Sequence, residues 1–157
     1  MSRAFFVLLL TLMTNIASAQ VWATAVSKNE REGTAIVYRY VQEFAEDFDR
    51  STQPNRVILV WRYNGEKGMP SIEERERMEE LESSLEAAVE KDGFSTLALV
   101  STGDNLKEWM YYANSENEFL LRLNAALGHK KPFPIEVHAS PDPQWNTYTR
   151  FISGVKQ

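Results

Sequence analysis

The amino-acid sequence predicts an α+β fold in which two helices cover one face of a mainly antiparallel sheet. Short runs of β-branched and aromatic residues alternate with two longer segments of helical periodicity. A Ser-x-x-Glu capping box marks the start of each predicted helix. The expected order is β-β-β-α-β-β-α-β. Its last six elements form the βαββαβ string of a ferredoxin-like fold, and the first two extend the sheet as an N-terminal β-hairpin.

The first nineteen residues are typical of a cleavable export signal. Arg3 supplies a positive charge, residues 4–13 are almost all apolar, and the small residues Ala17 and Ala19 fit a peptidase site before Gln20. The apolar run is too short for a membrane span, which needs about 20 residues. We therefore expect residues 1–19 to be a signal peptide and residues 20–157 to form a single α+β domain. The alternatives are an uncleaved anchor and a buried N-terminal helix.

Three strands are expected before the first helix. Residues 21–26 and 34–41 flank a polar turn and are rich in β-branched or aromatic side chains. Residues 43–55 are acidic and then contain a proline, which predicts a loop. Residues 56–63 are nearly all apolar, as expected for a central strand.

The first helix begins at the capping box of Ser71 and Glu74 and is expected to end near Asp92, with Gly93 as its left-handed cap. Its predicted apolar stripe consists of Ile72, Met78, Leu81, Leu85, Ala88 and Val89. The charged residues of this helix lie on the opposite side, which indicates a solvated face.

A hairpin and a second helix follow. Residues 94–101 and 106–112 are expected to pair across a turn at residues 102–105. The second helix begins at the capping box opened by Ser115 and ends at Gly128. Its stripe consists of Phe119, Leu120, Leu123 and Leu127. After it we expect a short strand at residues 135–139, a turn at 140–143, and then either a helical turn or an extended tail at 144–151.

Composition narrows the classes of function. The chain carries a formal net charge of −5 and contains no cysteine. A protein that binds nucleic acid uses basic groups to displace the counterions of the phosphates, so an acidic surface argues against such binding. It also argues against attachment to anionic lipid. The missing cysteine excludes disulfides, thiolate metal sites and thiol chemistry. We therefore expect a periplasmic or secreted protein without nucleic-acid partners and without stable membrane anchoring after signal cleavage.

No catalytic, metal-binding or cofactor-binding motif stands out. The segment from Gly65 to Gly68 lacks the spacing of a phosphate-binding loop. The two histidines, His129 and His138, have no metal-ligand spacing between them. We therefore expect no metal and no cofactor.

Paired aromatic residues on the predicted strands are the most suggestive feature. Side chains two positions apart share one face of a strand, and tryptophan and tyrosine combine stacking surface with a polar group. If helices cover only one face of the sheet, such rings can line the other. The candidate ligand-binding residues are Trp61, Tyr63, Trp109, Tyr111, Trp145 and Tyr148. The alternative is that these rings pack across strands beneath a covered second face.

Three segments resemble a known family. They are the Gly65 to Pro70 turn before a glutamate-rich helix, the strand from Leu106 to Tyr112 with its paired tyrosines, and the closing Asp142-x-x-Trp145-x-x-Tyr148. Together with the order of elements, they resemble domain-of-unknown-function family 695 over residues 22–151. The resemblance implies a fold and assigns no catalytic residue.

The sequence favours a non-catalytic binding or protein-interaction module whose ligand is a protein, a peptide or a small molecule. The first alternative is a hydrolase without a recognisable motif, which would use Asp104, His138 or Asp142. The second alternative is a small acidic immunity or inhibitor protein.

Overall fold

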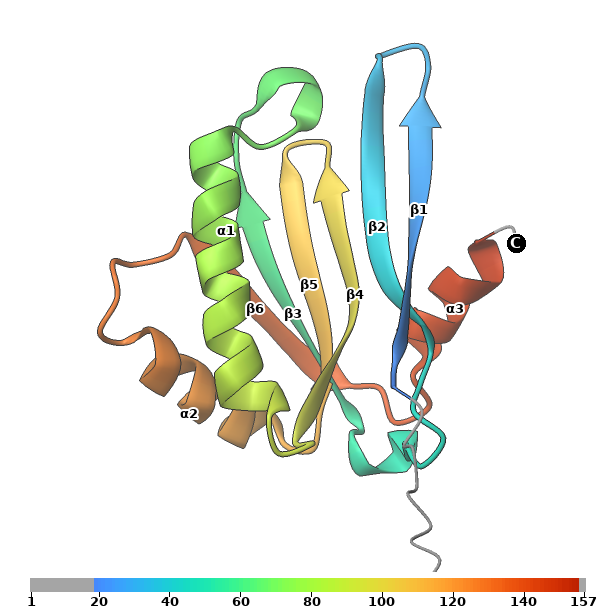
Figure 1. The fold of residues 1–157 in the computed structure, drawn as a ribbon, viewed down its shortest axis with the longest axis vertical. Coiled ribbons are helices and arrows are strands. Elements are labelled where there is room, and N and C mark those ends of the chain that lie inside the picture. Colours follow the sequence, from blue (N-terminus) through green and yellow to red (C-terminus); the bar gives the residue numbers. More distant parts are fainter. Residues whose placement is uncertain (1–18, 156–157) are drawn as a thin grey trace, which may run out of the picture.

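The computed structural model describes residues 19–155, in which six strands form one antiparallel sheet (Figure 1). The strands are β1 (Val21–Asn29), β2 (Thr34–Glu43), β3 (Asn55–Arg62), β4 (Ser95–Gly103), β5 (Leu106–Ala113) and β6 (Ile135–Pro141). The helices are α1 (Ile72–Leu85), α2 (Glu116–Leu127) and α3 (Asn146–Gly154), with short helical turns η1 (Arg50–Thr52), η2 (Glu66–Gly68) and η3 (Glu86–Glu90). The predicted α+β class is confirmed, whereas the expected signal peptide falls almost entirely outside the described residues.

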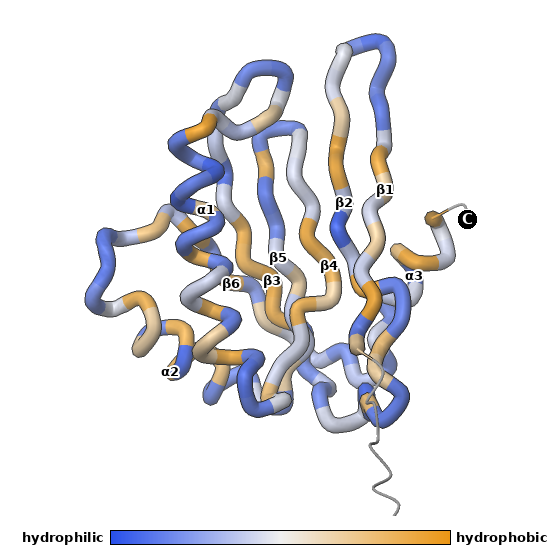
Figure 2. Tube along the Cα trace, in the orientation of Figure 1, coloured by the Kyte–Doolittle hydropathy of each residue, from blue (hydrophilic) through white to orange (hydrophobic). Residues whose placement is uncertain are grey.

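The strands lie in the order β1-β2-β4-β5-β3-β6, and every neighbouring pair is antiparallel. Helix α1 connects β3 to β4, and α2 connects β5 to β6. Strands β1 and β2 therefore form one side of the sheet, beyond β4, and β1 is an edge strand (Figure 1). Figure 2 shows apolar stretches within the strands, while the connecting loops are mostly polar.

Local sequence signals explain the element boundaries. The Ser71 and Ser115 hydroxyls accept the N–H groups of Glu74 and Glu118, at 3.2 Å and 3.3 Å, as the capping boxes predicted. At the β4–β5 turn, Asp104 adopts φ of 54° and its neighbour a φ of 61°. Two successive positive φ values are those of the tight turn that matches strand twist, so this hairpin forms where the sequence predicts it.

Helices α1 and α2 cover one face of the sheet. Their buried side chains, which include Met78, Leu81, Leu85, Phe119 and Leu123, form one core with inward side chains of β3, β4 and β5. Val89, in η3, extends this core. Within α1, buried Met78, Leu81 and Leu85 confirm the predicted stripe, whereas Ile72 occupies the first helical position and is exposed. The last two predicted members, Ala88 and Val89, also contact this core but lie in η3. Within the described residues, no helix is both long and apolar enough to cross a bilayer.

A third helix, α3, packs on the other face of the sheet, so the fold has one helix more than the two that the sequence predicts. It lies where a helical turn or an extended tail was expected, at residues 144–151. Trp145 and Tyr148 pack on Ala98, Met110 and Tyr112 of the sheet and form a second core. Trp145 precedes the helix with φ of 54° and makes no capping hydrogen bond with its own side chain. The Asp142 carboxylate instead accepts the N–H groups of Asn146 and Thr147, the first two residues of the helix. The N-cap position holds Trp145 and not a residue that usually caps helices, so α3 depends on Asp142 and on packing against the sheet.

Candidate functional site

The six predicted ring positions all lie in the interior, and none is more than 9% exposed. Four of them, Trp61, Tyr63, Trp109 and Tyr111, belong to the core beneath α1 and α2. The other two, Trp145 and Tyr148, lie beneath α3. In the free protein these rings therefore pack the two faces of the sheet, as the cross-strand alternative described, and present little surface to solvent.

The residues of the hydrolase alternative are spread along the sheet. Asp142 donates its N–H to the Pro54 carbonyl, just before β3 begins. His138 is paired with Ile58 in the middle of that strand. Asp104 lies in the β4–β5 turn, beyond the other end of β3. The structure does not bring the three together, and within residues 19–155 no three histidine, aspartate or glutamate side chains are placed to hold a metal ion.

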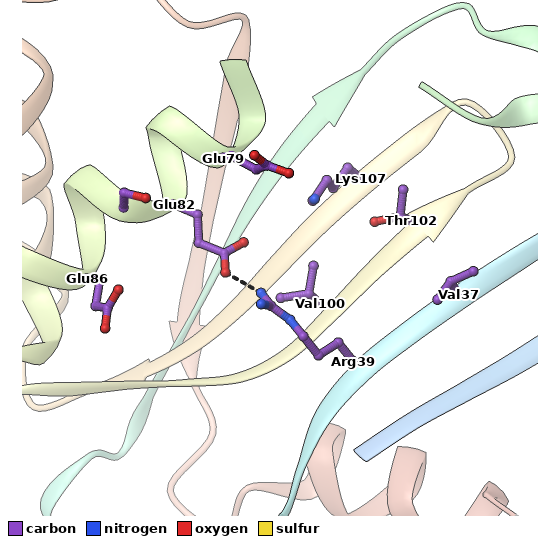
Figure 3. Close-up of a pocket in the computed structure, with 9 residues that line it drawn as sticks. Val37, Arg39, Glu79, Glu82, Glu86, Val100, Thr102 and Lys107 are labelled. Carbon is purple, nitrogen blue, oxygen red and sulfur yellow. Dashed lines mark hydrogen bonds and ion pairs between the residues drawn. The ribbon is translucent and has the colours of Figure 1, made fainter. Parts of the chain in front are cut away.

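A groove of about 250 Å³ lies between α1 and the sheet, and residues of α1, β2, β4 and β5 line it (Figure 3). We call it the charged groove; its polar lining comprises Arg39, Glu79, Glu82, Ser83, Glu86, Thr102 and Lys107. The glutamates recur every three or four residues, so they form one stripe along the helix. The cations come from β2 and β5, where side-chain alternation turns them toward α1.

Glu82 is held at the centre of this groove by two different partners. One carboxylate oxygen pairs with the Arg39 guanidinium from β2. The other accepts the indole N–H of Trp109 at 2.8 Å. Trp109 thus lies beneath the groove and fixes the carboxylate that binds Arg39, so this predicted residue supports the groove from the core.

Of the two cations that line the charged groove, Arg39 is paired and Lys107 is not. Among the described residues, no carboxylate lies within 4.0 Å of its amine. The amine lies 5.1 Å from the centre of the Trp109 ring. Burial lowers the pKa of Lys107, the Glu82 carboxylate partly opposes this change, and Arg39 adds to it. A ligand carboxylate beside this amine would remove the main electrostatic cost of its burial.

The charged groove continues along the sheet toward the N-terminal end of α1. An adjoining hollow of about 470 Å³ shares Lys107 and Glu79 with it and extends to Pro70 and Arg75. On the opposite side, the Arg39 guanidinium lies over the ring of Trp22 in β1, at 5.2 Å. Together these parts form an elongated surface with an apolar residue at one end.

Sequence reasoning missed Arg39, Glu82 and Lys107. The sequence did contain one signal for Lys107. It lies two residues before Trp109 and four before Tyr111 in the same strand, so its side chain shares their inward face. A cation on the inward face of a strand is unusual unless it is paired or serves a ligand. The groove forms because β2, β5 and α1 lie close together in space. That proximity depends on the order of the strands in the sheet, which the position of Lys107 in its strand does not reveal.

One comparison with known proteins gave a match. A family model described as "Family of unknown function (DUF695)" matches residues 20–153, nearly the whole described part of the chain. No curated protein and no solved structure matches the chain.

Proposed function

We propose that this chain, which belongs to the DUF695 family of unknown function, is an exported, non-catalytic module that binds a carboxylate-bearing peptide or protein segment in its charged groove. The observation that carries this proposal is the unpaired Lys107 amine, largely withdrawn from water and facing the groove. A charge-assisted hydrogen bond to such an amine is stronger than one formed in open solvent.

The surrounding charges restrict the ligand. Glu79 and Glu86 line the same groove and repel a ligand that carries several negative charges, such as a nucleic acid. A peptide provides one carboxylate for Lys107 and backbone N–H groups for the glutamates. The elongated shape also suits a peptide better than a compact metabolite.

The finer fold assignment belongs to this proposal. The order β4-β5-β3-β6, with α1 and α2 as the two crossovers, supports a ferredoxin-like unit. Strands β1 and β2 then form an added hairpin, and β2 contributes Arg39 to the groove. In this view, the addition of the hairpin creates the site.

Export is supported by the agreement of three boundaries. The expected cleavage site precedes Gln20, the family match begins at residue 20, and β1 begins at Val21. Cleavage there removes no residue of the described sheet. We expect protein recovered from the producing cell to begin at Gln20, as measured by N-terminal sequencing and intact mass. Recovery of a chain that still carries Met1 or Ser2 would contradict both the cleavage and the proposed location.

Replacing Lys107 with glutamine is expected to abolish selection of acidic peptides. Panning a displayed peptide library against the native protein should enrich aspartate and glutamate over asparagine and glutamine, and Lys107→Gln should remove that enrichment. A hydrogen bond to a charged group contributes about 1.5–3 kcal/mol, so affinity should fall roughly tenfold to 150-fold. The matched control is Lys91→Gln, because Lys91 is exposed and does not line the charged groove. Equal enrichment with both variants would contradict the proposed site.

A further inference from the structure

Strand β1 is an edge strand that lacks the usual protection against pairing. Its nine residues contain one charged side chain, Lys28. The opposite edge strand, β6, carries Glu136 and His138, which share one face of the strand and are exposed, and it ends at Pro141. Charges and prolines are the common devices that keep an edge strand from adding another strand. By this criterion β6 is protected and β1 is open.

The exposed apolar side chains gather on the same strand. Five large hydrophobic residues are exposed among residues 19–155, and three of them lie on β1: Val21 (42%), Trp22 (39%) and Val26 (53%). Trp22, Thr24 and Val26 alternate onto one face, where they stand beside Val41, Arg39 and Val37 of β2. The open edge therefore also carries an unpartnered apolar strip.

We propose that β1 pairs antiparallel with β1 of a second copy of the chain, around a twofold axis at Thr24. In this register, Trp22 of one copy lies opposite Val26 of the other, and Ala23 lies opposite Ala25. The exposed apolar side chains thus cover each other twice, once on each side of the axis. Lys28 falls opposite Gln20, so no two like charges meet.

The resulting assembly is limited to two copies. Each copy has one β1 edge, and pairing around a twofold axis occupies the β1 edge of both. The outward N–H and C=O groups of β1 gain partners, and the sheet becomes continuous through both copies. Both copies present α1 on the same side and α3 on the other. This proposal goes beyond the peptide-binding proposal and does not depend on Lys107.

Sedimentation equilibrium of the purified protein tests the pairing. We expect a concentration-dependent dimer. The double variant Trp22→Lys/Val26→Lys places like charges opposite each other and should weaken the dimer at least roughly tenfold. The double variant Trp22→Lys/Val26→Glu places opposite charges together and should restore it. The control Ile72→Lys/Leu121→Lys changes exposed apolar residues of α1 and α2 and should leave the dimer intact.

Cross-linking provides a second measurement in the native background. Because the chain has no cysteine, Thr24→Cys introduces a single thiol that faces itself across the axis and should form a disulfide-linked dimer on mild oxidation. Lys28→Cys, four residues away on the same face, should not. The proposal is overturned if the native protein stays monomeric at all concentrations, if the two charge variants behave alike, or if both cysteine variants cross-link equally.

Discussion

Replacing Trp145 with alanine is expected to lower the free energy of unfolding by about 3–5 kcal/mol, one of the largest losses available to a single substitution in this protein. The indole is fully buried and stacks on the Tyr112 ring, with centroids 3.8 Å apart and planes 9° apart. Its N–H donates to the carbonyls of Gln53 at 2.9 Å and Arg50 at 3.2 Å. The substitution therefore leaves a large cavity and takes one hydrogen-bond donor from each of two carbonyls.

Urea unfolding followed by circular dichroism measures this loss. Trp145→Phe should cost less, because it keeps an aromatic ring beside Tyr112; it loses the N–H donor, whose contribution is about 1 kcal/mol, and a smaller part of the buried ring system. Leu121→Ala is the control at an exposed site and should change stability by less than about 0.5 kcal/mol. A Trp145→Ala variant as stable as this control would show that α3 does not depend on the indole for its attachment.

The elements that the sequence predicts well are those specified by local chemistry. The α1 and α2 starts follow from serine hydroxyls that cap them, and the β4–β5 turn follows from residues that accept positive φ. These signals act within a few residues of one another. Side-chain alternation likewise grouped Trp61 with Tyr63 and Trp109 with Tyr111 on common faces, as the structure has them.

The elements that the sequence did not predict depend on contacts between distant segments. Helix α3 has nine residues and begins after Trp145, which is in a left-handed conformation and makes no side-chain cap bond, so the usual start signal is missing at the N-cap position. Trp145 and Tyr148 are buried because α3 packs on the second face of the sheet. The charged groove requires Arg39 of β2 to stand beside Val100 of β4, a register set by pairing across some sixty residues of chain.

Asp142 is the main polar anchor between the second core and α3. The carboxylate is buried and accepts hydrogen bonds from the Tyr112 hydroxyl at 2.8 Å and from the N–H groups of Asn146 at 2.8 Å and Thr147 at 3.0 Å. Burial opposes ionisation of Asp142, but the hydrogen bonds from Thr147, Tyr112 and Asn146 together outweigh it. They hold the pKa of this carboxyl below its usual value.

Asp142→Asn is therefore expected to lower the free energy of unfolding by about 2–4 kcal/mol near pH 7, because hydrogen bonds to a charged acceptor are replaced by contacts with a neutral amide. A lowered pKa in the folded state means that the carboxylate stabilises the protein above the unfolded pKa of about 3.9, and that this contribution is lost as the pH falls through the folded pKa. The difference between the native protein and Asp142→Asn should therefore shrink in acid.

Urea unfolding at a series of pH values from about 7 to about 3 measures this convergence. The change of the free energy of unfolding with pH reports how many more protons the unfolded state binds than the folded state. Asp104→Asn is the matched control, because Asp104 lies in an exposed turn whose positive φ asparagine also accepts. Tyr112→Phe removes one donor to Asp142, so its effect should be smaller in the Asp142→Asn background than in the native protein. A stability difference that is constant across the whole pH range would show that the charge of Asp142 does not hold α3 on the sheet.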